Sequence, residues 1–332
     1  MLRAMGSTSQ SAQEQAFIAA RRGVKRLDEA EIDAHLALAF SREHWAALAP
    51  GLSIEGGAPA AALEARPIDE AERGRLLQRL AIEGWFRADP VFDAGVVEAM
   101  RAAVAGLVAR GWPPVFAYVY DELWQVLRTP SLTALLSSAL GPGYRLSPRV
   151  WAFHVPSEAG AAGWPPHVDG GANTHTTDRM TLWIPLGDAT LENGCMVVVP
   201  RNRLPESTPD AFANDMSRLP PSTWRAMLQG SRALPARAGS VLGWDFQVIH
   251  WSGIVGDAGA PPRVSLAVEA FGENIVPTPS EEPLLDPGEL PPLSERLRAI
   301  ARGLLSYERF EPQMLRFTGL ARRLLAELDV GA

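Results

Sequence analysis

The sequence predicts an α+β fold, in which helices surround an antiparallel barrel or jelly roll. Helical periodicity is found up to Leu140 and returns near the end of the chain. Between Tyr144 and Phe271 the pattern changes to short runs rich in β-branched and aromatic residues, which glycine, proline and Asn-Gly turns separate. Many short strands with such turns are typical of a barrel or a jelly roll.

The amino-acid composition excludes several classes of protein and partner before any motif is considered. The chain has 332 residues, of which 47% are hydrophobic and 21% charged, as in globular proteins. A net charge of -7 without a basic block predicts no nucleic-acid partner. We see neither a membrane-length apolar run nor the apolar core of a secretory signal, so no membrane partner is expected. The single cysteine, Cys195, excludes a disulfide within the chain, a zinc ribbon and an iron–sulfur cluster, and it favours a cytoplasmic location.

Residues 1–66 are expected to form a poorly patterned helical extension. They are rich in Ala, Glu and Arg, and helical spacing is weak around 12–22 and 28–48. The stretch 51–67 contains clustered glycine, alanine and proline, so we expect a loop there.

Three helices are expected between Ile68 and Gly143, because apolar residues recur there at helical spacing. The first is expected to end at Gly84, the second at Gly111 and the third at Gly141, since glycine is favoured just past a helix end.

Six strands are expected next, in the segments 149–155, 179–186, 194–200, 240–246, 248–253 and 263–271. After Pro277 a Pro-rich connector leads to helical patterning from Leu293 to Leu328. We therefore divide the chain into the extension (1–66), a core of helical lead-in plus strands (67–276) and a C-terminal helical region with its connector (277–332).

The candidate metal ligands are His167, Asp169 and His250. His167 and Asp169 are two residues apart, so on a strand their side chains would share a face. Two histidines and one carboxylate form the facial triad that holds non-haem Fe(II) and leaves coordination positions open. The alternative is that His167 and Asp169 simply pair in a turn.

Arg263 is the candidate anion-binding residue. Strand alternation places Arg263 and Ser265 on one face of the segment 263–271. A buried guanidinium is costly unless it meets an anion, and its fork suits a carboxylate. Arg263 is therefore a candidate clamp for a dicarboxylate cosubstrate, and the alternative is an ion pair with a buried Asp or Glu.

The motifs together resemble the phytanoyl-CoA dioxygenase family of Fe(II)/2-oxoglutarate oxygenases. The similarity lies in five segments, namely the helix near 69–84 with the Gly-Trp that follows it, HVPSEAGAAGWPPHVDG (154–170), TLWIPLGDATLENGCMVVVP (181–200), RAGSVLGWDFQVIHWSG (237–253) and PRVSLAVEAF (262–271). The resemblance implies a double-stranded β-helix, or cupin-like jelly roll, with helices packed around it.

The resemblance also implies a metal site and a cosubstrate site. His167, Asp169 and His250 would bind Fe(II), and Arg263 would bind the 5-carboxylate of 2-oxoglutarate, with Ser252 or Ser265 as hydrogen-bond donor. The other contacts that it implies for 2-oxoglutarate are Trp183, Thr181 and His154. Barrel packing is the alternative for Trp183, and a structural role is the alternative for His154.

The activity that follows is that of an oxidoreductase, a non-haem iron dioxygenase that uses Fe(II), 2-oxoglutarate and O₂. Asp169 favours hydroxylation or desaturation, because relatives that transfer halide commonly lack this carboxylate. We expect oxidation of an unactivated C–H bond in a small, largely apolar molecule of specialised metabolism, with release of succinate and CO₂. The alternatives are a non-catalytic jelly-roll binding protein and a metal-dependent cupin enzyme that does not use 2-oxoglutarate.

Overall fold

The computed structural model describes residues 21–330, apart from 57–62, 64, 171–177, 206, 207, 209, 210, 213–218, 258, 278–282 and 309. The weak helical pattern of 12–22 therefore lies almost wholly outside the described residues. No helix in the described part of the chain is long and apolar enough to cross a membrane.

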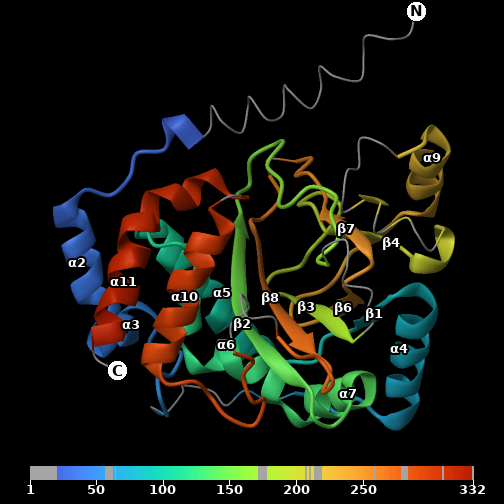
Figure 1. The fold of residues 1–332 in the computed structure, drawn as a ribbon, viewed down its shortest axis with the longest axis horizontal. Coiled ribbons are helices and arrows are strands. Elements are labelled where there is room, and N and C mark those ends of the chain that lie inside the picture. Colours follow the sequence, from blue (N-terminus) through green and yellow to red (C-terminus); the bar gives the residue numbers. More distant parts are fainter. Residues whose placement is uncertain are drawn as a thin grey trace, which may run out of the picture.

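The core consists of two antiparallel sheets, as Figure 1 shows. The five-stranded sheet has the order β1 (Trp85–Ala88), β6 (Val241–Asp245), β3 (Arg179–Pro185), β8 (Arg263–Phe271) and β2 (Arg145–Val155). The three-stranded sheet has the order β5 (Arg232–Leu234), β4 (Met196–Val199) and β7 (Ile249–Ser252). All six predicted strands are present, whereas the short strands β1 and β5 were not predicted from the sequence.

The register of the large sheet gives it two different faces. Ser265 of β8 lies opposite Phe153 of β2 and Pro185 of β3, and residues opposite each other in a sheet share a face. The face that carries Val264 and Leu266 packs into the main hydrophobic core with the helices. The other face is therefore left for the residues at odd positions of β8.

The helical lead-in is as predicted. It comprises α4 (Glu70–Glu83), α5 (Ala94–Ala109) and α7 (Pro130–Leu140). Gly84 ends α4 with a φ of 82°, a left-handed conformation that glycine adopts without a steric penalty. Between α5 and α7 lie η1 (Pro114–Val119), α6 (Asp121–Gln125) and η2 (Val126–Arg128), which are too short to show helical periodicity in the sequence.

Three other helical segments differ from the prediction. The pattern of 28–48 is two helices, α2 (Glu29–Ala39) and α3 (Arg42–Leu48), because Ser41 starts a new helix as its N-cap. The pattern of 293–328 is likewise α10 (Leu293–Tyr307) and α11 (Thr318–Val330), separated by η5 (Pro312–Phe317). The helix α9 (Pro221–Gly230) was not predicted from the sequence.

The N-terminal and C-terminal regions are joined to the core through a buried carboxylate. Asp121 accepts hydrogen bonds from the amides of Glu55 and Gly56, both at 2.9 Å, and from the hydroxyl of Ser53 at 3.0 Å. It also forms an ion pair with Arg296 of α10, at 2.5 Å, and both side chains are 1% exposed. Burial acts to raise the pKa of Asp121, but the Gly56 amide and the Arg296 guanidinium outweigh it and lower that pKa.

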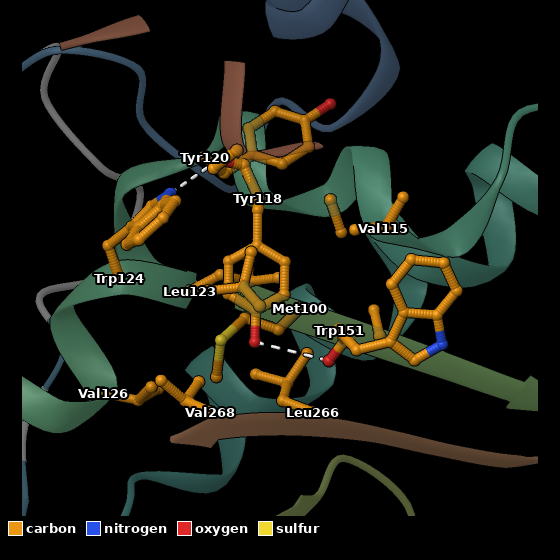
Figure 2. Packing of buried hydrophobic residues seen from close by; sticks show 14 of the residues in the cluster. Met100, Val115, Tyr118, Tyr120, Leu123, Trp124, Val126, Trp151, Leu266 and Val268 are labelled. Carbon is orange, nitrogen blue, oxygen red and sulfur yellow. Dashed lines mark hydrogen bonds between the residues drawn. The ribbon is translucent and has the colours of Figure 1, made fainter. Parts of the chain in front are cut away.

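Tyr118 supports strands β2 and β8, both of which contribute residues to the cavity described below. Figure 2 shows its ring among buried side chains that include Met100, with its hydroxyl pointing at the backbone of β2. The hydroxyl lies 3.5 Å from the carbonyl of Trp151 and 3.4 Å from that of Ala267 in β8. The indole of Trp124 donates to the carbonyl of Tyr118 at 2.6 Å, so the support is itself held in place.

We expect Asp121→Asn to lower the free energy of unfolding by about 3–5 kcal/mol, because it leaves the Arg296 charge buried and unpaired. The lowered pKa means that this contribution is present above the unfolded-state pKa of about 4 and is lost as the pH falls through the folded-state value. Urea unfolding at pH 7 measures the effect. The control is Asp329→Asn, which breaks an exposed ion pair of Arg298 on the same helix and should cost less than about 1 kcal/mol. Equal losses in the two variants would contradict the assignment.

Candidate active site

The three predicted metal ligands meet at one point. Their ligand atoms all lie within 4.8 Å of one another, and no other group of this kind occurs among the described residues. Asp169 Oδ1 is 3.5 Å from Nε2 of His167 and 3.6 Å from Nε2 of His250. The two imidazole rings are 4.2 Å apart between centroids.

A backbone bridge, and not a regular strand, brings His167 to the site. The amide of His167 donates to the carbonyl of His250 at 3.0 Å, and the amide of His250 donates back at 2.9 Å. His167 and Asp169 do converge, as predicted, but the predicted cause is wrong: they do not share a strand face, because no strand contains them. The bridge fixes the same convergence by pairing this segment with β7.

Both histidines present the nitrogen that a metal needs. Nδ1 of His167 lies 2.7 Å from the carbonyl of Pro165, and Nδ1 of His250 lies 2.9 Å from that of Val248. A carbonyl can only accept, so each Nδ1 carries the proton and each Nε2 keeps its lone pair. This is the usual way in which a protein orients a ligating imidazole.

Asp169 is oriented by two donors on one of its oxygens. Oδ2 accepts from the Thr181 hydroxyl at 2.6 Å and from the Trp244 indole at 2.9 Å. Oδ1, which faces both imidazoles, remains available as a ligand atom. The carboxylate is thus turned by strands β3 and β6 toward the histidines.

Asp169 and His250 are in charge states that suit a divalent metal. At His167 burial acts to lower the pKa, but the neighbouring Asp169 outweighs it and raises that pKa, so a metal ion would displace a proton there. Burial lowers the pKa of His250 to about 4, so its imidazole is neutral near pH 7. Burial acts to raise the pKa of Asp169, but the two imidazoles outweigh it and hold that pKa well below its usual range. A neutral imidazole and an ionised carboxylate are the forms that bind metal. The donor set of two nitrogens and one oxygen therefore fits Fe(II) in a facial triad.

Arg263 points into the same space and has no carboxylate partner among the described residues. It is 2% exposed, and its Nη2 donates to the Ser252 hydroxyl at 2.6 Å. Its guanidinium lies 5.7 Å from the centroid of the Trp183 ring, and its Nε has no hydrogen-bond partner. Burial lowers the pKa of Arg263 to about 10, since no anion compensates the charge. The alternative of a buried ion pair is therefore wrong for the described part of the chain.

The hydroxyl of Ser265 is a second buried polar group without a partner, and it lies on the same face of β8 as Arg263. Buried polar groups in native proteins are rarely left unsatisfied, so each such group needs an explanation. An anion bound beside Arg263 would compensate the guanidinium charge, and Ser265 is the next residue on the same strand face.

The triad and Arg263 share one cavity between the two sheets. Its walls are largely aromatic, with contributions from Trp151, Phe153, Trp164, Trp183 and Trp244. The small sheet adds Met196, His250 and Ser252. Apolar walls with a few convergent polar groups are typical of small-molecule sites.

Two residues that were predicted to contact 2-oxoglutarate have other surroundings or partners in the structure. His154 lies opposite Val264, on the helix-facing side of β2, and it lines a second cavity and not that of the triad. The structure therefore does not support His154 as a 2-oxoglutarate contact; the strand alternation puts its neighbour Phe153 in the triad cavity. Thr181 lines the triad cavity, but its hydroxyl is engaged with Asp169.

Four polar residues at the cavity were not predicted from the sequence. Glu269 and Arg149 line it from β8 and β2, and Tyr307 lines it from α10. Burial raises the pKa of Glu269 to about 7. Glu311 accepts hydrogen bonds from the indoles of two wall residues, Trp151 at 3.0 Å and Trp164 at 2.9 Å. Alternation along β8 from Arg263 would have identified Glu269, whereas no sequence signal links Tyr307 or Glu311 to the site.

Comparison with known proteins agrees with this geometry. Residues 115–255 match the family model of phytanoyl-CoA dioxygenase (PhyH). The predicted resemblance is thereby confirmed for this part of the chain. The enzyme class that it implies, a 2-oxoglutarate-dependent non-haem iron dioxygenase, needs two histidines and one carboxylate as metal ligands, and the structure brings such a group together. No curated protein matches the chain by sequence.

Two solved structures show the same fold. One is the epimerase SnoN in complex with Fe3+, alpha ketoglutarate and nogalamycin RO, with 22% identity over 67% of this chain and 97% of SnoN, at a TM-score of 0.50. The other is the non-heme monooxygenase ThoJ, with 17% identity over 76% of this chain and 99% of ThoJ, at a TM-score of 0.51. The predicted α+β fold with a cupin-like jelly roll is confirmed.

We expect Thr181→Val to weaken Fe(II) binding about tenfold or more, because loss of a hydrogen bond that orients a metal ligand typically has this effect. Thr181→Ser keeps the hydroxyl and should retain the affinity. Anaerobic titration with Fe(II), followed by the fluorescence of the cavity tryptophans, measures both variants. If Val and Ser at this position gave the same affinity, the hydroxyl would have no role in orienting Asp169.

Proposed function

We propose that this chain, whose residues 115–255 match the phytanoyl-CoA dioxygenase family model, hydroxylates or desaturates an unactivated C–H bond of a small, largely apolar molecule. Fe(II), 2-oxoglutarate and O₂ together supply the oxidising power when they are bound, and succinate and CO₂ are released. The observation that carries the proposal is Arg263, a buried cation that no described carboxylate neutralises and that faces the cavity of the triad.

Each residue of the site has a defined task in this proposal. His167, His250 and Oδ1 of Asp169 would hold Fe(II), and Thr181 keeps the carboxylate turned toward it. Arg263 would bind the 5-carboxylate of 2-oxoglutarate, since its planar fork matches a carboxylate.

The neighbours of Arg263 support this assignment. The Ser252 hydroxyl positions the guanidinium, and the unpartnered hydroxyl of Ser265 is available to donate to the same carboxylate. Trp183 covers the guanidinium with its ring.

The aromatic walls support an apolar substrate. They keep water from the reacting centre and provide apolar area for binding. A specialised-metabolite substrate is part of the proposal, and SnoN, which has this fold, is described in complex with nogalamycin RO together with Fe3+ and alpha ketoglutarate. A cytoplasmic location stays a prediction and rests on the single, buried Cys195.

We expect a visible charge-transfer band when Fe(II) and then 2-oxoglutarate are added to the protein without oxygen. His167→Ala should abolish the band because it removes a metal ligand. His154→Ala is the matched control, since His154 lies on the other face of the sheet, and it should leave the band intact. A folded wild-type protein without a band would refute the oxygenase proposal and favour the binding-protein alternative.

We expect Arg263→Leu to raise the 2-oxoglutarate concentration needed for half of the band about 10- to 100-fold, the equivalent of a hydrogen-bonded charge. Fe(II) affinity should not change, because Arg263 is not a metal ligand. Arg263→Lys keeps the charge but loses the fork, so its effect should be intermediate. Wild-type dependence on 2-oxoglutarate in Arg263→Leu would instead favour the cupin enzyme that does not use this cosubstrate.

A further inference from the structure

The cavity has two polar ends, and both lie on strand β8. Arg263 lines one end and Glu269 lies at the other, because residues at alternate positions of a strand share a face. Glu269 lies six positions after Arg263 on an extended strand, which corresponds to roughly 20 Å along it. A five-carbon cosubstrate that is anchored at Arg263 cannot reach Glu269, so this end of the cavity is left for the substrate.

Glu269 lies beside the metal ligands. It pairs in register with Thr181, whose hydroxyl bonds to Asp169. A group that binds Glu269 would therefore place its neighbouring carbon atoms close to the triad. This is the position in which a substrate must be held for oxidation of one particular C–H bond.

The Glu269 carboxylate keeps acceptor capacity toward the cavity. Ser147, Arg149 and Arg179 of β2 and β3 favour its ionised form, against the effect of burial. A carboxylate has about four lone-pair positions, so it can accept from a ligand as well as from such neighbours. The side chain is half-buried and lines the cavity, with Tyr307 of α10 also facing this space.

We propose that Glu269 is the substrate-recognising residue and that it accepts a hydrogen bond from a hydroxyl or ammonium group on an otherwise apolar substrate. The inference rests on the function proposed above and adds the polar group that such a substrate carries. Trp151 and the other aromatic walls would bind the apolar part, and Glu269 would set which carbon faces the iron.

The test compares three probes of nearly equal size: cyclohexylmethanol, cyclohexylmethylamine and ethylcyclohexane. The first two carry a donor and the third does not. Binding to the anaerobic protein with Fe(II) and 2-oxoglutarate is followed by the fluorescence of the cavity tryptophans. For each variant, the ratio of the ethylcyclohexane Kd to the Kd of each donor probe measures the preference for a donor.

At pH 8, above the Glu269 pKa of about 7, we expect Glu269→Leu to reduce this ratio at least about tenfold, because a hydrogen bond to a charged group is lost. Glu269→Gln separates the two donors: its amide oxygen still accepts from a hydroxyl but has no charge for an ammonium. If Glu269→Gln loses the preference for cyclohexylmethylamine but keeps the preference for cyclohexylmethanol, a hydroxyl is a sufficient donor. Glu273→Leu is the matched control, since it removes an exposed carboxylate just beyond the same strand, and it should leave both ratios unchanged.

An unchanged ratio in Glu269→Leu, or no binding of either donor probe by the wild-type protein, would overturn the inference. The charge-transfer band, recorded in the same samples, separates this result from failure of the proposed function. A band in both proteins with an unchanged ratio removes only the role of Glu269. No band in the wild-type protein removes the oxygenase proposal itself.

Discussion

Two backbone hydrogen bonds between His167 and His250 are the interaction on which the site depends. They join a segment without regular structure to strand β7 and so bring the two imidazoles to 4.2 Å of each other. Asp169 follows two residues later and is turned toward them by Thr181 and by Trp244 of the large sheet. The ligand set is thereby held from both sheets, which makes its geometry a property of the whole barrel.

The cavity contains charges that do not stabilise the fold by themselves. Arg263 is buried without a described carboxylate partner, and Glu269 has its pKa raised to about 7 by burial. Buried charges cost free energy unless a partner compensates them, and a bound ligand is such a partner. The protein therefore keeps two ionisable groups in this cavity, a guanidinium at Arg263 and, above neutral pH, a carboxylate at Glu269. Each suits a different ligand: a dicarboxylate at Arg263 and a hydrogen-bond donor at Glu269.

The regions outside the barrel contribute to the site as well as to stability. Tyr307 and Glu311, at the end of α10 and just beyond it, reach the cavity and its tryptophan wall. Helix α10 is in turn fixed to the core by the pair of Arg296 and Asp121. Figure 1 shows α10 and α11 on one side of β2 and β8, with β7 and β4 on the other side. The position of the cavity wall is thus coupled to the packing of the C-terminal helices.

The sequence by itself determined the elements and the chemistry, because these depend on local periodicity and on residue type. The six strands, the helical lead-in and the identity of His167, Asp169, His250 and Arg263 were all predicted from it. Tertiary structure alone decided which groups face one another. The bridge to His250, the turn of Thr181 toward Asp169 and the reach of Glu311 to the tryptophans join segments far apart in the chain, and no local pattern encodes such pairings. The placement of His154 on the helix-facing side of β2 has the same cause. Alternation along a strand shows which residues share a face, but only the register with β8 shows which face lines the cavity.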